Sequence, residues 1–230
     1  MDSSKWIEYQ DIIRQLEAEG RVKRTFRRLD PTRQQAVINA ILEEAAEKGP
    51  AALNMKTIAD RAGVAIGSLY QYFPNREGLL GFAVELCVRS ITTLFEMALP
   101  YLQSMPLADA LRSTLSYGLE WGQAESGLVR FFGRAAYQGD PILAERLVRP
   151  VAQAMRNLTF HILTAAKERG EISPGIDLEA ASRLVNGLLI VVGDSQMLPY
   201  LNTYFQISDE SSGGEEMVTT AVGFILKALR

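Results

Sequence analysis

The stretch from residue 54 to residue 76 reads NMKTIADRAGVAIGSLYQYFPNR and combines basic, hydroxyl and amide side chains. Gln71 carries an amide that can pair with adenine, and the Ser68 hydroxyl can donate to or accept from several base edges. Lys56 and Arg76 can neutralise phosphates. Gly67 has no Cβ atom, so a phosphate or a base edge can approach its backbone closely. These groups have the chemistry to contact duplex DNA, and the elements that carry them decide whether they do.

Enzyme chemistry finds little support in the sequence. The chain of 230 residues has one histidine, His161, and one cysteine, Cys87. A hydrolase needs a nucleophile, a base and a group that orients the base, and no G-x-S-x-G turn is present. Phosphate-loop and dinucleotide-binding motifs are also missing. We therefore expect no enzymatic activity, no metal site and no cofactor.

The charge of the chain is unevenly distributed. The net charge is −3, yet residues 21–76 carry ten Lys or Arg against five Asp or Glu, a local charge of +5. The densest part is Arg21–Arg28, RVKRTFRR. We interpret it as a linker after the first helix, with a solvated charge run, a packing extension and a DNA-binding arm as open roles. The candidate arm residues are Arg24, Arg27 and Arg28.

Apolar residues recur at steps of three and four almost throughout, which predicts an all-α fold. Gly20 ends the first helix, and an acidic Gly/Ser-rich loop over 208–216 precedes the last one. Pro150 is expected to kink its helix. The helices are predicted over about 6–19, 31–48, 55–62, 66–72, 76–98, 106–123, 125–138, 141–169, 178–198 and 217–229.

Two short helices over 55–62 and 66–72, joined by a turn with Gly63, form a helix-turn-helix pattern. The stretch IADRAGVAIGSLYQYFPNREGLL resembles the DNA-binding domain of TetR-type (TetR/AcrR-like) transcriptional regulators over residues 30–80. The resemblance implies an N-terminal three-helix DNA-binding domain and a helical ligand-binding and dimerisation domain. The implied domains are 1–29 (N-terminal helix and basic arm), 30–80 (helix-turn-helix) and 81–230 (effector binding and dimerisation).

The resemblance also implies roles for single positions. Tyr70 and Tyr72 sit where the family binds backbone phosphates, although packing is the alternative role for each of them. Arg76 replaces a phosphate-binding lysine. Ala65 stands where the family has a Ser or Thr cap, which removes one phosphate ligand. The implied DNA-binding residues are Met55, Lys56, Ala65, Ile66, Gly67, Ser68, Tyr70, Gln71, Tyr72 and Arg76.

Aromatic and sulfur-containing side chains gather in the middle helices, where the resemblance implies an effector cavity and core packing is the alternative. Few Lys or Arg accompany them, which favours an apolar or amphipathic effector. For His161, a hydrogen-bonded place in the core is the alternative. The candidate effector-binding residues are Trp121, Phe131, Phe132, Tyr137, Met155, Phe160 and His161.

The last two helices carry broad apolar surfaces, for which core packing is again the alternative. The resemblance implies a homodimer interface with residues Leu184, Leu188, Val191, Val218, Val222 and Ile225. We expect a cytoplasmic, ligand-responsive DNA-binding regulator, a repressor released from its operator by an effector, without a membrane partner. The alternative is an effector-independent architectural or division-control protein that binds DNA.

Overall fold

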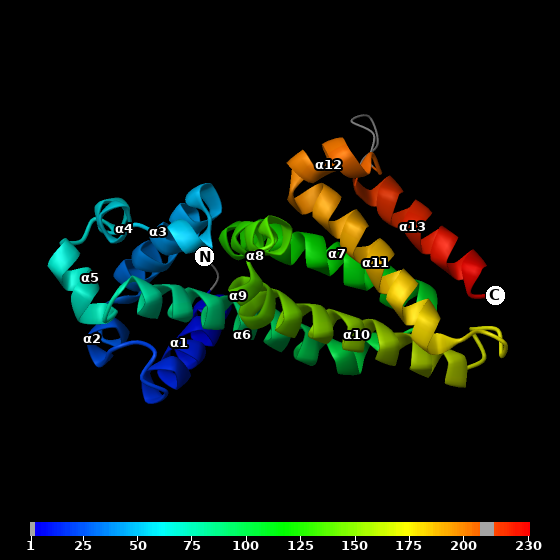
Figure 1. Cartoon of the computed structure of the whole chain (residues 1–230). Coiled ribbons are helices and arrows are strands. Elements are labelled where there is room, and N and C mark those ends of the chain that lie inside the picture. Colours follow the sequence, from blue (N-terminus) through cyan, green and yellow to red (C-terminus); the bar gives the residue numbers. More distant parts are fainter. Residues whose placement is uncertain (1–2, 208–213) are drawn as a thin grey trace. The chain divides into compact units, whose positions relative to one another are not determined.

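The computed structural model describes residues 3–207 and 214–230, and within them every regular element is a helix (Figure 1). This confirms the predicted all-α class. The predicted acidic loop lies largely outside the described residues. Packing divides the chain into two units, each built from two separate stretches: Met1–Ile91 with Gly127–Val151 forms unit 1, and Thr92–Ser126 with Ala152–Arg230 forms unit 2. The functional boundary at residue 80 stays a prediction.

Unit 1 carries the helix-turn-helix motif, and the predicted helix starts after Asp30 and Asn75 are confirmed. The Asp30 carboxylate accepts the Arg33 N–H at 3.0 Å, and the Asn75 side chain accepts the Gly78 N–H at 2.8 Å. The elements are α1 (Ser3–Ala18), α2 (Arg24–Arg27), α3 (Pro31–Lys48), η1 (Pro50–Ala52), α4 (Met55–Ala62), α5 (Ile66–Tyr72), the first part of α6 (Arg76–Leu102), α8 (Ser126–Gln138), α9 (Pro141–Leu143) and η2 (Ala144–Val148).

The prediction of a linker over the basic run is wrong. Residues 24–27 form α2, in which Phe26 is completely buried, and Val22 is 2% exposed. The Phe26 ring lies 5.7 Å from the Tyr72 ring and 5.4 Å from the rings of Phe73 and Phe82, measured between centroids. The charges around Val22 and Phe26 hid two apolar residues four positions apart, which is a helical spacing.

Helix α6 runs past its predicted end at residue 98 and includes Pro100. The proline lies two residues before the last helical residue, so the helix loses one hydrogen bond near a terminus rather than in its middle. An 18-residue window of α6 has a mean hydropathy of 1.5, which together with its length would suit a membrane span. Half of that window is buried inside the protein, as expected for a core helix.

The predicted long helix changes type just before Pro150, while the kink itself stays a prediction. Asp140 caps α9 by accepting the N–H groups of Ile142 and Leu143 at 2.9 and 3.0 Å. The chain then forms the π-helical η2 and continues as α10 (Arg149–Glu168). Proline has no N–H group for the preceding turn, and a local π-turn is one way to accommodate that loss.

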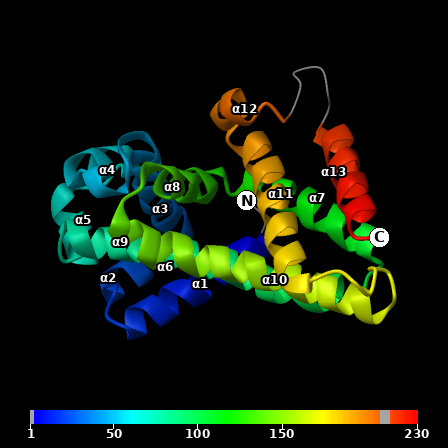
Figure 2. The ribbon, with the colours of Figure 1, turned by 45° about the vertical axis from the view of Figure 1, so that its right-hand side comes forward.

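Unit 2 contains α7 (Leu107–Ala124), α11 (Leu178–Met197), α12 (Pro199–Phe205) and α13 (Gly214–Ala228), besides the end of α6 and most of α10. Helices α7, α11 and α13 lie side by side (Figure 2) and bury residues such as Leu111, Val192 and Val222. Helix α12 was not predicted, because Pro199 indicated an end, whereas it opens a new helix. Glu171 accepts the Leu107 N–H at 2.7 Å and thereby caps α7.

Candidate nucleic-acid interface

The two helices of the motif pack through small and branched apolar residues. Ile58, Ala59 and Leu69 are at most 1% exposed. Gly63 ends α4 with a φ of 65°, a left-handed conformation that favours glycine. Asn54 caps α4 by accepting the N–H groups of Lys56 and Thr57 at 2.9 and 3.2 Å. These local features turn the chain sharply into α5, the predicted recognition helix.

Four predicted DNA-contacting residues lie on the exposed side of α5. Ile66 is 44% exposed and Tyr70 is 47% exposed, and Gly67 and Gln71 are exposed beside them. Ile66 and Tyr70 are four positions apart, as are Gly67 and Gln71, so each pair forms neighbours on the helix surface. Ser68 is half-buried at the edge of this face. The arrangement brings together an amide, a phenol and a bare backbone on a single surface.

No other described part of unit 1 covers the first residues of α5. Ala65, the N-cap residue, is exposed and makes no side-chain hydrogen bond to the helix. A Cβ atom added at Gly67 would meet nothing within 4 Å, so packing within the protein does not require glycine there. A phosphate or a base edge can therefore come close to this backbone.

Two predicted residues turn inward. Met55 is 8% exposed, which leaves its backbone rather than its side chain for DNA. Tyr72 is 7% exposed and its ring belongs to the aromatic cluster with Phe26. Packing, the alternative for Tyr72, accounts for its position, and Tyr70 is the exposed tyrosine of the pair.

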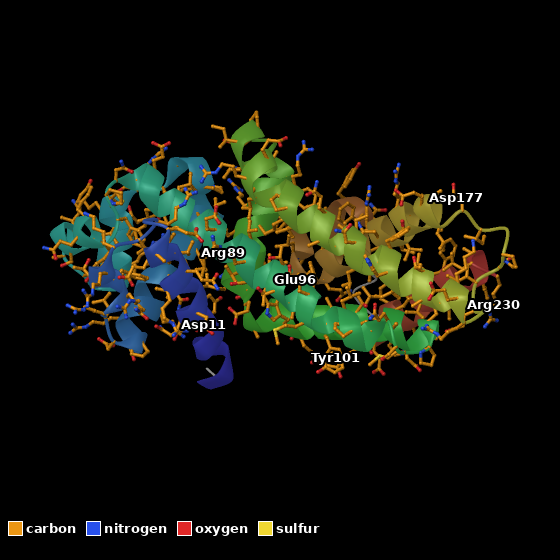
Figure 3. All side chains as sticks on the ribbon, turned by 90° about the horizontal axis from the view of Figure 1, so that it is seen from below. Asp11, Arg89, Glu96, Tyr101, Asp177 and Arg230 are labelled. Atoms are coloured by element: carbon orange, nitrogen blue, oxygen red, sulfur yellow. The ribbon has the colours of Figure 1, made fainter. Side chains whose placement is uncertain are left out.

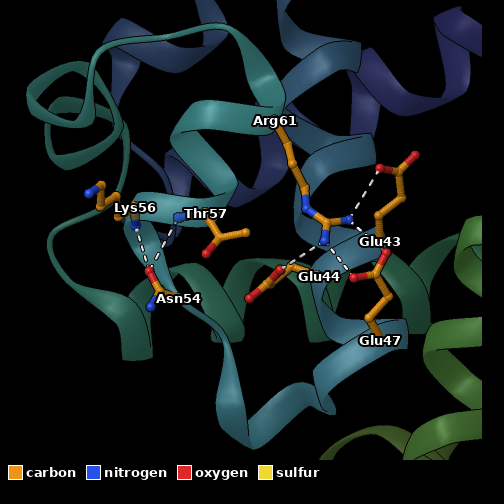
Figure 4. A network of polar contacts seen from close by, with 7 residues as sticks. All are labelled: Glu43, Glu44, Glu47, Asn54, Lys56, Thr57 and Arg61. Atoms are coloured by element: carbon orange, nitrogen blue, oxygen red, sulfur yellow. Dashed lines mark hydrogen bonds and ion pairs between the residues drawn. The ribbon is translucent and has the colours of Figure 1, made fainter.

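Arg61 on α4 is held by three carboxylates of α3 (Figure 4). Its guanidinium donates to both oxygens of Glu47, at 2.9 and 2.5 Å, and lies 3.4 Å from Glu44 and 3.7 Å from Glu43. Glu44 is only 2% exposed. The hydrogen bonds from Arg61 lower the pKa of Glu47 below its usual value. Sequence analysis missed this network, because acidic residues on a helix ordinarily form a solvated face.

Two other cations predicted to bind DNA lie outside this network. Lys56 and Arg76 are exposed at the first turns of α4 and α6. Figure 4 shows the Lys56 side chain extending away from the carboxylates around Arg61. Of the candidate arm residues, Arg24 and Arg28 are exposed, whereas Arg27 forms an ion pair with Glu17 of α1. The arm is thus a folded segment, and Arg27 is engaged inside it.

The predicted effector residues divide between the two units. Phe131, Phe132 and Tyr137 belong to unit 1, and the other four, Trp121, Met155, Phe160 and His161, belong to unit 2. Phe131 is completely buried, as core packing requires, and Tyr137 is 47% exposed. His161 is exposed and its Nδ1 lies 2.8 Å from the Asn157 carbonyl, so the expected place in the core is wrong.

Two cavities in unit 2 are lined by other residues. One, of about 370 Å³, contains Arg112, Ser116, Leu119, Gln123 and Gln196 among its lining. The other, of about 550 Å³, lies between Pro106, Glu171, Leu226 and Arg230. None of the predicted effector residues lines either cavity. Polar and apolar residues alternate irregularly in these linings, so a search for apolar residues at helical spacing could not identify the cavities from the sequence.

Half of the predicted dimer residues point into the unit itself. Val218, Val222 and Ile225 are at most 3% exposed and belong to the core of unit 2, which corrects their assignment to an interface. They face α7 and α11, because these two helices cover that side of α13. Leu184 is 76% exposed, and Leu188 and Val191 are half-buried. Phe224, which sequence analysis did not select, is 66% exposed.

Comparison with known proteins relates one part of the chain, residues 37–81, to a family. The description "Bacterial regulatory proteins, tetR family" matches residues 37–81. The repressor KstR of Mycobacterium tuberculosis is 42% identical over 48 residues, which are 21% of this chain and 22% of KstR. The chain thus matches less than a quarter of that relative's length. The fatty acid metabolism regulator protein of Bacillus subtilis is 24% identical over 156 residues, 66% of this chain and 77% of that protein.

The fold has a solved counterpart. The crystal structure of the transcriptional regulator FadR from Bacillus subtilis, in complex with stearoyl-CoA, superposes with a TM-score of 0.64 at 19% identity. The superposition covers 85% of this chain and 99% of that one. The motif, the helical architecture and the family match agree with one another. Residues 37–81 match the tetR family of bacterial regulatory proteins, and the fold of the chain is similar to that of a solved transcriptional regulator.

Proposed function

We propose that the protein is a transcriptional repressor that binds operator DNA and is released from it by a small apolar or amphipathic effector. The exposed face of α5, with Ile66, Gly67, Tyr70 and Gln71, is the observation that carries the proposal. A helix of this kind enters the major groove, where its side chains reach base edges. The site of action is the cytoplasm.

Within this proposal, base contacts and phosphate contacts are made by different residues. Gln71 and Ser68 read bases, while Tyr70, Lys56 and Arg76 bind the phosphates that flank them. Arg24 and Arg28 add further phosphate contacts at the end of the recognition helix. Because Phe26 is part of the core, the arm is best tested by Arg24→Ala and Arg28→Ala rather than by deletion.

We also propose a homodimer. Two recognition helices must lie one helical turn of DNA apart, about 34–36 Å, to bind successive major grooves. Leu184 and Phe224 are large exposed apolar residues on the last two long helices, and Leu188 and Val191 adjoin Leu184 on α11. Exposed apolar residues in such a group mark a protein interaction site.

For the effector, a long-chain acyl thioester is the first compound to test. FadR from Bacillus subtilis was solved with stearoyl-CoA, an amphipathic molecule, and KstR is named a repressor. The FadR complex supports an amphipathic effector, and the name of KstR supports repression. The alternative is effector-independent DNA binding, as in an architectural or division-control protein.

One experiment separates the alternatives. The full-length protein is used to select duplexes from a random-sequence pool, and the enriched duplex is titrated with and without stearoyl-CoA. Repression by release predicts a sequence-specific complex that the thioester weakens. A specific complex that no acyl thioester, sterol or other apolar compound weakens favours the alternative. Selection without enrichment rejects specific DNA binding altogether.

A further inference from the structure

The C-terminal end of the recognition helix is held by the segment that precedes the helix-turn-helix motif. Helix α5 has only seven residues, and the last carbonyl groups of any helix lack partners within it. The Tyr72 carbonyl accepts the backbone N–H of Lys23 at 3.0 Å. The Gln71 carbonyl accepts the Thr25 hydroxyl at 2.5 Å, and the Lys23 ammonium lies 3.4 Å from the Tyr70 carbonyl. Three successive carbonyls thus meet two residues of one segment.

This segment is itself fixed to the core of unit 1. The Gln34 side chain, 1% exposed, donates to the carbonyls of Phe26 and Arg27 at 2.9 Å each. The Phe26 ring contacts aromatic rings on both sides of the α5–α6 junction. Residues 23–26 therefore form a bridge between the core and the end of α5.

Helix α1 anchors the same segment from its other side. Arg89 of α6, labelled in Figure 3, donates to Gln15 at 3.1 Å and to Glu19 at 2.7 Å. Arg27 pairs with Glu17. Ile13 and Leu16 of α1 are completely buried. The bridge thus has a foundation that does not depend on DNA.

We infer that residues 23–26, which we name the clamp, position the recognition helix for base readout. Thr25 and the backbone of Lys23 are positioning groups: they hold the carbonyl end of α5, whose exposed residues include Tyr70 and Gln71. The inference rests on the proposed function and adds to it a determinant of specificity outside the motif. If the end of the helix frays, the Gln71 side chain moves away from its base. Base contacts should therefore depend on the clamp more strongly than phosphate contacts do.

The first test needs no DNA. Amide hydrogen exchange is measured on the full-length protein, Thr25→Val and Thr25→Ser. Loss of one hydrogen bond to a carbonyl changes an equilibrium by about two- to tenfold. We expect Thr25→Val to speed exchange at residues 69–73 by about threefold while α4 stays unchanged, and Thr25→Ser to restore the original rates. Unchanged rates in α5, or equal acceleration throughout unit 1, would overturn the clamp.

A second pair of variants isolates the backbone contact. Lys23 has a φ of −84°, close to the value that proline adopts. Lys23→Pro removes two groups, the backbone N–H that donates to the Tyr72 carbonyl and the side-chain ammonium. Lys23→Ala removes the ammonium only. The clamp predicts faster exchange at the end of α5 in the proline variant than in the alanine variant. Identical behaviour would exclude a role for the backbone contact.

The consequence for DNA is read from two duplexes, the one selected by the full-length protein and a scrambled duplex of equal length. Thr25→Val should weaken binding to the selected duplex about threefold more than binding to the scrambled one, because Gln71 reads bases whereas Tyr70 binds phosphate in either duplex. Equal weakening on both duplexes would assign Thr25 to general electrostatic or structural support. Failure to select any duplex would reject the proposed function, while the exchange data would still decide the clamp.

Discussion

Gly67 stands at the exposed start of the recognition helix, where an alanine would meet no neighbour. Glycine costs a helix about 1 kcal/mol relative to alanine, so Gly67→Ala should raise the free energy of unfolding by up to about that amount. The added methyl group should at the same time weaken binding to the selected duplex several-fold. Urea unfolding and fluorescence anisotropy, on one preparation, measure both quantities.

The matched control is Gly63→Ala. Gly63 has a φ of 65° and an alanine there is strained by about 1 kcal/mol, so that variant should lose stability. If Gly67→Ala binds the selected duplex as tightly as the unaltered protein, DNA does not approach the helix at this residue.

Arg76 is the exposed cation at the first turn of α6. Arg76→Ala should weaken binding to all duplexes alike and reduce the slope of log affinity against log salt by about 1, as for one lost phosphate contact. His161→Ala, a change of an exposed residue in unit 2, should leave both the affinity and the slope unaltered. A change confined to sequence preference would contradict a phosphate-binding role for Arg76.

At the scale of elements, the contact between α3 and α4 depends on Arg61 and its carboxylates. Glu47 has a lowered pKa in the folded protein, so its ion pair stabilises the fold at pH values above the ordinary glutamate pKa of 4.5. This stabilisation is lost as the pH falls through the lowered folded pKa. Arg61→Ala should lower the Tm at pH 7 and flatten its dependence on pH below about 4.5. Thermal unfolding at a series of pH values checks both expectations.

Glu47→Gln is the control for that series. It removes the titrating group but keeps Arg61 beside the buried Glu44, so its Tm at pH 7 should exceed that of Arg61→Ala. Leaving a buried carboxylate without its cation is the costlier change. A Tm for Arg61→Ala equal to that of the unaltered protein would show that the network does not hold α3 against α4.

Capping residues made most helices predictable. Asp30, Asn54, Asn75, Asp140 and Asp177 each cap a helix at the predicted position, because a side-chain oxygen next to free N–H groups is a local signal. Helices α2 and α12 were missed for equally local reasons: charges masked Phe26, and Pro199 served as a start rather than a stop. The N-terminal end of α7 is capped by Glu171, 64 residues from Leu107 in sequence, a partner that no local pattern can reveal.

At the scale of the whole molecule, glutamate substitutions on the buried side and on the exposed side of the last two long helices should have opposite effects on stability and on oligomeric state. Val222 is buried in the core of unit 2, and Val222→Glu should lower the Tm sharply, because an unpaired carboxylate is costly inside a protein. Leu184 is exposed, and Leu184→Glu should leave the Tm of the subunit unchanged but halve the mass measured by light scattering. A Leu184→Glu protein of unchanged mass places the interface elsewhere.

The coupling between effector and DNA is also a property of the whole molecule. If stearoyl-CoA weakens DNA binding by some factor, the DNA must weaken stearoyl-CoA binding by the same factor. Two titrations, each performed with and without the other ligand, measure the two factors. An effector that binds tightly and leaves DNA affinity unaltered would reject release as the mechanism.

The candidate DNA surface was more predictable than the candidate effector and dimer surfaces. The residues of α5 lie within one short helix, so their shared face follows from helical geometry. The aromatic residues from Trp121 to His161 come from several helices, and their periodicity states only that each helix has an apolar side. The same limit applies to Val218 and Val222, whose apolar stripe faces inward where an interface was expected.

Unit 1 is discontinuous in sequence, which matters to anyone who would build hybrid regulators. Leu42 contacts the position of a Cβ atom at Gly127 at 3.3 Å, and the buried Cys87 thiol lies 3.8 Å from the Leu128 carbonyl. Residues 127–151 therefore pack within unit 1, the unit that carries the helix-turn-helix motif, as do the clamp and α1. A cassette cut at residues 37–81, the part that the family model matches, would leave all three behind. A helix-turn-helix motif transferred between such proteins should fold only when these flanking segments are transferred with it.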